Sequence, residues 1–225
     1  MTVDQVLDEL HARANPDNVA GMARFGINSA QTLGISVTEL RRLARTIGRD
    51  HQLALDLWAS GIHEARILAS LVDEPDCVTP EQMDAWVADF DSWDVCDQVC
   101  GNLFDRTPFA FDKVVEWSYR DEEFVRRAAF ALLAELAIHD KRAPDDRFLA
   151  CFSLIVAAAT DERNYVKKAV NWALRQIGKR NPALNVRAIE LAHEIQQIDS
   201  RAARWIASDA LRELMGAPVQ EKLQR

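Results

Sequence analysis

Hydrophobic side chains recur at spacings of three and four residues along most of the chain, which is the pattern of amphipathic helices. The pattern predicts helices near residues 2–13, 16–25, 37–48, 51–60, 62–73, 80–90, 92–104, 108–118, 122–138, 145–160, 163–179, 182–196 and 200–215. The sequence contains no sustained alternation of polar and apolar residues and no Asn-Gly or Asp-Gly hairpin turn. The predicted fold class is therefore all-α.

Several predicted helices carry start signals. An N-cap residue followed by proline at the first helical position occurs at Asn15-Pro16, Thr79-Pro80, Thr107-Pro108 and Asn181-Pro182. The segments 36–39 and 79–82 also fit the capping box. The longest apolar run, residues 148–159, is too short to span a bilayer and predicts a buried helix.

The helices contain an internal repeat. Residues 124–136 align with residues 165–177 at an offset of 41, and residues 201–206 align with residues 168–173 at an offset of 33. Helix pairs of about 40 residues are typical of HEAT-type repeats, which stack into a curved solenoid. We therefore expect one domain over residues 1–225, with the equivalent basic positions Arg127 and Lys168 lining one surface.

Charge is unevenly distributed along the sequence. The formal net charge is -8, but residues 1–120 hold 10 basic and 20 acidic residues, whereas residues 121–225 hold 17 and 15. The acidic total argues against loose coating of DNA, while a local basic surface is possible because distant charges are screened. Any nucleic acid is therefore expected on the second half.

Other features of composition favour a cytoplasmic protein. The N-terminus has no signal peptide, and the four cysteines do not have the density of a disulfide framework. The cysteines are interpreted as small core residues of a protein in a reducing compartment. The protein is expected to be nucleoid-associated if the host is bacterial. Neither the cysteines nor the five histidines show metal-ligand spacing, so no metal or other cofactor is expected.

Residues 163–187 hold seven basic residues and no acidic one. In a helix, one apolar stripe is formed by Val166, Ala169, Val170, Ala173, Leu174 and Ile177. Trp172 lies off that stripe, on the side that carries Lys168, Arg175 and Lys179. An aromatic ring among cations suits nucleic acid. The alternative is a tryptophan packed against a neighbouring helix beside a solvated basic face.

A second tryptophan stands one helical turn before an acid. Trp93 and Asp97 point together away from an apolar stripe of Val95, Cys96, Val99 and Leu103. Such a pair is commonly a half-buried indole beside a surface carboxylate. Asp94 is expected to be the more exposed acid.

These segments together resemble the DNA alkylation repair family, the HEAT-like-repeat alkylpurine DNA glycosylases. The similar segments, in family order, are residues 15–25, 33–43, 93–97, 125–129 and 166–175, followed by the Asn-Pro pair at 181–182. They span about three quarters of the chain.

The resemblance implies an enzyme of base excision repair, a monofunctional glycosylase acting on cationic N3- or N7-alkylated purines in double-stranded DNA without base flipping. It implies that Asp97 is the catalytic aspartate and that Trp93 and Trp172 are the tryptophans of a concave cleft. It also implies DNA-backbone contacts by Arg127 and Arg175. The protein is expected to act as a monomer, with no membrane partner.

The chain departs from the family pattern at two aromatic positions. The N-terminal position that commonly holds tyrosine is Phe25, and an aromatic pair near the start of the Trp172 helix is reduced to Asn164-Tyr165. Phe25, Tyr165, Lys168 and Lys179 complete the candidate DNA contacts. Two alternatives stay open, a non-catalytic paralogue that binds DNA structures and a protein–protein scaffold.

Overall fold

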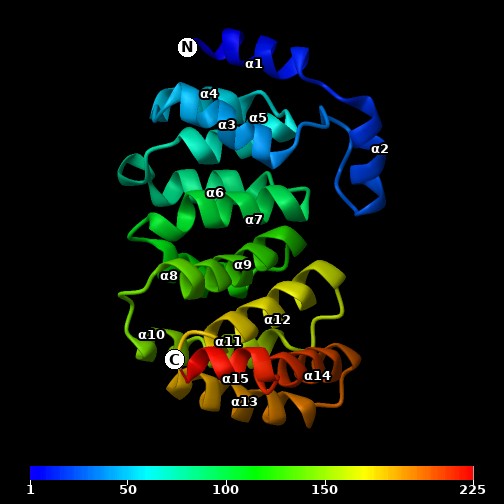
Figure 1. Cartoon of the computed structure of the whole chain (residues 1–225), viewed down its shortest axis with the longest axis vertical. Helices are drawn as coiled ribbons and strands as arrows, with labels where there is room; N and C mark the ends of the chain where they lie inside the picture. Colours follow the sequence, from blue (N-terminus) through cyan, green and yellow to red (C-terminus); the bar gives the residue numbers. More distant parts are fainter. Residues whose placement is uncertain (225) are drawn as a thin grey trace. The chain divides into compact units, whose positions relative to one another are not determined.

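The computed structural model describes residues 1–224, which contain helices and turns but no β-strand (Figure 1). The all-α prediction is therefore confirmed. The chain divides into two compact units, Met1–Thr107 and Pro108–Arg225. The expectation of a single domain over residues 1–225 stays a prediction.

The first unit is built from seven α-helices and two short 3-10 helices. They are α1 (Val3–Ala12), α2 (Pro16–Arg24), α3 (Val37–Ile47), α4 (His51–Ala59), α5 (His63–Val72), η1 (Pro75–Cys77), α6 (Pro80–Ala88), α7 (Trp93–Asn102) and η2 (Phe104–Arg106). Helix α5 packs against α3, α4 and α7. In the core, the indoles of Trp58 and Trp86 stack with ring centroids 4.0 Å apart.

The second unit contains α8 (Ala110–Ser118), α9 (Glu123–His139), α10 (Asp145–Ala150), α11 (Phe152–Ala158), α12 (Asn164–Gly178), α13 (Pro182–Gln196), α14 (Arg201–Leu214) and α15 (Ala217–Leu223). Helix α12 packs against α9, α11, α13 and α14. The six residues of its predicted apolar stripe are all fully buried. The aligned positions Phe124 and Tyr165 stack across α9 and α12 with ring centroids 5.4 Å apart.

Most predicted helix starts are confirmed. Pro16, Pro80 and Pro182 each stand in the first turn of a helix, behind an N-cap side chain that accepts a backbone N–H. The predicted start at Thr107-Pro108 is wrong, because α8 begins at Ala110. The Thr107 hydroxyl instead donates to the Phe104 carbonyl at 2.8 Å, so it closes the turn after η2.

The predicted buried helix over residues 145–160 is also wrong in its continuity. Cys151 separates α10 from α11, and its backbone N–H bonds to the Phe148 carbonyl three residues back. This tight turn ends α10 and precedes α11. Burial raises the pKa of the Cys151 thiol to about 11. Cys77 is exposed, so the prediction that all four cysteines are core residues fails there.

A buried carboxylate fixes the loop before α3. The fully buried side chain of Glu64 accepts the backbone N–H groups of Leu33, Gly34 and Ile35 at 2.8, 2.7 and 3.2 Å. These bonds compensate the cost of burying the carboxylate. They tie the segment between α2 and α3 to α5.

Within residues 1–224, the longest helices lack the length and apolarity that crossing a bilayer would require.

Candidate functional site

Helix α7 of the first unit carries Trp93 and Asp97. Its predicted apolar stripe is confirmed, since Val95, Cys96, Val99 and Leu103 are buried. Both Trp93 and Asp97 are partly exposed on the other side of the helix. The helix therefore presents an indole and a carboxylate one turn apart.

The loop after α2 holds the Trp93 indole. Trp93 Nε1 donates to the backbone carbonyl of Phe25 at 3.0 Å. Phe25 is the C-cap of α2, and the residue is 76% exposed. The sequence-predicted residues Phe25 and Trp93 are thus brought together, through the Phe25 backbone rather than through its ring.

Asp97 and Asp94 are both partly exposed, so the expectation that Asp94 is the more exposed acid stays a prediction. Asp94 is bonded to a residue of α5. Its side chain is 13% exposed and accepts a 2.8 Å hydrogen bond from His63 Nε2 on α5. Burial alone would lower the pKa of His63, but the hydrogen bond and negative charge of Asp94 outweigh it and raise that pKa. Burial likewise opposes ionisation of Asp94, while bonding to His63 lowers its pKa below the ordinary value. The pair is therefore favoured in its charged form.

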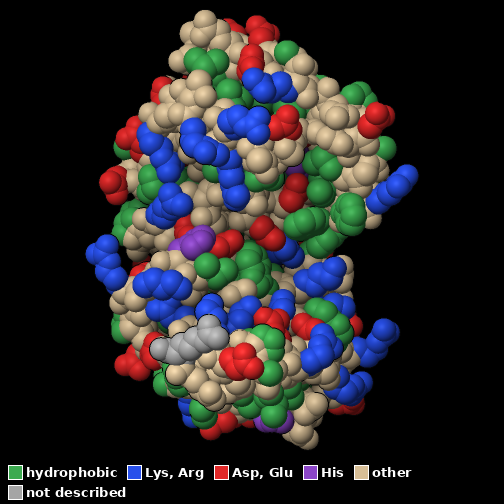
Figure 2. All heavy atoms as spheres, in the orientation of Figure 1, with side chains coloured by type: hydrophobic (Ala, Val, Ile, Leu, Met, Phe, Trp, Pro, Cys, Tyr) green, Lys and Arg blue, Asp and Glu red, His purple; other side chains and the backbone are tan. Residues whose placement is uncertain are grey.

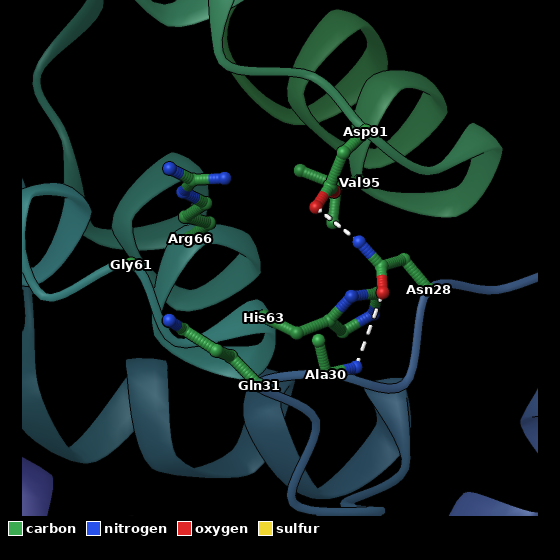
Figure 3. Close-up of a pocket in the computed structure, with 8 residues that line it drawn as sticks. All are labelled: Asn28, Ala30, Gln31, Gly61, His63, Arg66, Asp91 and Val95. Atoms are coloured by element: carbon green, nitrogen blue, oxygen red, sulfur yellow. Dashed lines mark hydrogen bonds between the residues drawn. The ribbon is translucent and has the colours of Figure 1, made fainter.

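His63 also lines a polar pocket of about 230 Å³ in the first unit (Figure 3). The lining residues are Asn28, Ala30, Gln31, Gly61, His63, Arg66, Asp91 and Val95. Asn28 Nδ2 donates to Asp91 Oδ2 at 2.6 Å and closes one side of it. The pocket adjoins α7 but is lined by neither Trp93 nor Asp97. No signal in the sequence points to it, because its residues come from distant segments.

Trp172 and the predicted cations belong to the second unit. Trp172 is partly exposed on α12, and Lys168 is exposed on the same helix. The Gln176 amide, oriented with its oxygen toward the donors, accepts from Trp172 Nε1 at 3.0 Å and from Lys179 Nζ at 3.2 Å. The indole N–H is thereby satisfied within its own helix.

Two of the predicted cations are held by an acid of α14. Lys179 Nζ lies 2.6 Å from Glu213 Oε1, and Arg175 pairs with Glu213 Oε2. Burial opposes ionisation of Glu213, but these two cations outweigh it and lower the pKa of its carboxyl. The face of α12 is therefore less positive than its sequence alone indicates.

Arg127 is not the surface cation that the repeat predicts. It is 5% exposed, and its Nη1 donates to the Tyr165 carbonyl at 2.7 Å. The bond links α9 to the first turn of α12. The expected row of equivalent exposed cations is thus wrong at Arg127, because its long side chain reaches the neighbouring repeat instead of solvent. The meeting of Trp172 with Trp93 and Asp97 in one concave cleft stays a prediction.

The fold and the sequence define the class to which the protein belongs. The chain belongs to the DNA alkylation repair enzyme family, which it matches over residues 6–214. Its fold is the all-helical HEAT-like repeat fold related to DNA glycosylases.

Individual relatives are distant. Two uncharacterized proteins, Lin0241 of Listeria innocua and Lmo0209 of Listeria monocytogenes, are 22% and 21% identical over 202 residues, 88% of this chain and 88% of each relative. A solved structure described as a new family related to the HEAT-like repeat DNA glycosylases, with affinity for branched DNA structures, is similar with a TM-score of 0.78. The alignment covers 95% of this chain and 96% of that chain. Because the two are only 18% identical, the similarity establishes the fold alone.

Proposed function

We propose that the protein is a monofunctional DNA glycosylase that hydrolyses the N-glycosidic bond of N3- and N7-alkylated purines in double-stranded DNA. The observation that carries the proposal is the Trp93–Asp97 face of α7 in a chain that belongs to the DNA alkylation repair enzyme family. The tethered indole also supports it, because Trp93 is held by the Phe25 carbonyl in a partly exposed position.

The reaction uses the charge of the lesion. Alkylation makes the purine cationic, so the bond from C1′ to the base breaks with its electron pair passing to the base. Positive charge then develops on the deoxyribose. The Asp97 carboxylate stabilises that charge and orients a water molecule onto C1′, while the proton of the water passes through Asp97 to solvent.

The indoles of Trp93 and Trp172 flank the sugar in this proposal. Each favours the developing cation through the negative face of its ring, by about 0.5–2 kcal/mol. The lesion stays stacked and no protein amine attacks the sugar, so the strand is not cleaved. Because the base does not enter a pocket in this proposal, the quality of the leaving group determines which lesions react.

The proposed DNA contacts in the second unit are Arg127, Lys168, Arg175, Lys179 and Tyr165, with Phe25 in the first. Lys168 is the cation most accessible to a phosphate, since it is exposed. Arg175 and Lys179 would exchange Glu213 for DNA phosphates. Arg127 reaches DNA only through the small part of its side chain left exposed.

A second candidate function is binding of branched DNA without catalysis. The solved structure with a TM-score of 0.78 comes from a family with that affinity, and this supports the alternative. Phe25 and Asn164 also depart from the aromatic pattern of the glycosylases.

Base release separates the two functions. Wild-type protein incubated with a duplex that contains one N7-methylguanine is expected to release the free base, measured by chromatography. The strand should break only after later treatment that cleaves abasic sites. Tight binding to branched DNA, with no base released from several cationic lesions, would favour the second function instead.

A further inference from the structure

Four arginines gather at α3 of the first unit. Residues 1–107 hold eight basic and eighteen acidic residues, a net of -10, yet half of the basic ones lie between residues 41 and 49. They are Arg41, Arg42, Arg45 and Arg49, all exposed. Figure 2 shows Lys and Arg side chains concentrated over the region that α3 occupies in Figure 1.

These arginines differ from most others in the chain because, within residues 1–224, none of them forms an ion pair with a carboxylate. Many of the other arginines on both units pair with carboxylates, such as Arg13 with Glu9 and Arg187 with Glu190. The neighbouring acids are engaged elsewhere. Glu39 bonds to Ser36 in the capping box, and Asp50 caps α4 through the Leu53 N–H at 3.0 Å.

Three of the four arginines line one hollow. It has a volume of about 440 Å³ and is lined by Arg41, Ala44, Arg45, Gly48, Arg49 and Leu71. Gly48 ends α3 with a φ of 85°, which a side chain would strain, and this turn brings Arg49 to the same hollow. The hollow is thus cationic at its rim and apolar where Ala44 and Leu71 line it.

The guanidinium groups are oriented by neutral acceptors. Arg45 Nε donates to the Arg41 carbonyl at 3.1 Å, and Arg49 Nη1 donates to the Asp73 carbonyl. Arg41 Nη2 makes a long contact of 3.4 Å with Gln98 Oε1. A carbonyl or amide partner leaves the positive charge of each guanidinium unneutralised and its other N–H groups available.

We propose that the hollow formed by Arg41, Arg45 and Arg49 binds the phosphodiester backbone of DNA, so that the acidic first unit has its own phosphate-binding site. Arg41 and Arg45 are four residues apart, a rise of about 6 Å along the helix, and the row suits successive phosphates better than one small anion. The planar fork of a guanidinium matches phosphate geometry. The inference rests on the proposed function in that DNA is the substrate, and it adds a contact in the first unit to those expected on the second half.

The test is the salt dependence of binding to an undamaged duplex, measured by fluorescence anisotropy. The double variant Arg41→Ala/Arg45→Ala should bind more weakly, and the slope of log affinity against log salt should fall in magnitude by about 2. Arg41→Lys/Arg45→Lys should keep most of the slope because it keeps the charge. Arg13→Ala, an exposed and already paired arginine of the same unit, is the matched control and should leave the slope unchanged.

A second measurement needs no variant. Bound duplex should protect Arg41 and Arg45 of the wild-type protein from an arginine-specific reagent, read by mass spectrometry. An unchanged slope in the alanine variant, or absence of protection, overturns the phosphate site. If the wild-type protein binds DNA but releases no base, the glycosylase proposal alone fails. If it binds no DNA, both fail.

Discussion

His63 and Asp94 form a largely buried ionisable pair at the start of α7. Their side chains are 4% and 13% exposed, and the pair joins α5 to the first turn of α7. Asp94 stands between Trp93 and Asp97 in the sequence. The pair therefore fixes the start of the helix that carries the proposed catalytic face.

The pair should make stability depend on pH. The pKa of His63 is raised in the folded protein, so its contribution is complete below the ordinary histidine value of about 6.5 and is lost as pH rises through the folded value. The pKa of Asp94 is lowered, so its contribution is present above about 4 and is lost as pH falls further. The loss of melting temperature in His63→Gln should therefore be larger at pH 5.5 than at pH 8.5. The exposed His11→Gln is the control, and an equal loss at both pH values in His63→Gln would contradict the account.

For individual residues, the sequence predicts which face of a helix a side chain occupies, but it does not predict contacts between helices. Helical periodicity places Trp93 and Asp97 on the side opposite the buried stripe of α7, in agreement with the structure. Periodicity cannot show that His63 reaches Asp94, because the two are 31 residues apart. For the same reason Arg127 was expected at the surface, whereas it reaches the Tyr165 carbonyl of the next repeat.

Helix α12 packs tightly against α13 and α14 at its C-terminal end. At Gly178, its last residue, a Cβ atom would lie 2.7 Å from Leu214 Cδ2 and 2.9 Å from Ala188 Cβ. Both distances are shorter than van der Waals contact, so α13 and α14 approach α12 only because position 178 has no side chain.

Gly178→Ala should therefore destabilise the protein. Overpacking costs about 1–3 kcal/mol, which exceeds the gain of about 1 kcal/mol from the better helix propensity of alanine. Gly21→Ala is the matched control, because nothing lies within 4 Å of its Cβ position in α2. Urea denaturation should show a lower free energy of unfolding for Gly178→Ala and an unchanged or higher one for Gly21→Ala. Equal stabilities would mean that α12 has room to shift.

An acid of α14 neutralises cations on the exposed side of α12. Glu213 holds both Arg175 and Lys179, so two of the proposed DNA contacts are neutralised in the free protein. Glu213→Gln should release Lys179 and leave Arg175 only its longer contact of 3.7 Å with Asp209. Duplex binding should therefore tighten, and its salt dependence should steepen by about one or two phosphate contacts. Glu194→Gln, an exposed acid of α13, changes the net charge equally without releasing a cation. Equal affinities of the two variants, measured by anisotropy, would remove Arg175 and Lys179 from the DNA interface.

At the scale of elements, sequence signals succeed where they are local. Asn15, Thr79 and Asn181 mark helix starts that the structure confirms. Thr107 fails because its hydroxyl closes the preceding turn, and the apolar run breaks at Cys151. Apolar periodicity shows neither of these local hydrogen-bonded turns.

At the scale of the whole molecule, charge counted over long segments conceals the local pattern. The first half is strongly acidic in total, yet its exposed surface contains the row from Arg41 to Arg49. The second half is basic in total, but Arg175 and Lys179 are paired with acid and Arg127 is buried. Local ion pairs, which a charge count does not show, therefore decide where an anionic backbone can bind.

In the proposed reaction, the Asp97 carboxylate drives hydrolysis at C1′. The direct measurement is single-turnover release of N7-methylguanine from a duplex by wild type and by Asp97→Asn, with the exposed Asp56→Asn as the control. Loss of a group that stabilises the developing charge should slow release by about 10²–10³-fold, while duplex affinity changes little and the control keeps the wild-type rate. Release by Asp97→Asn at the wild-type rate would contradict the account.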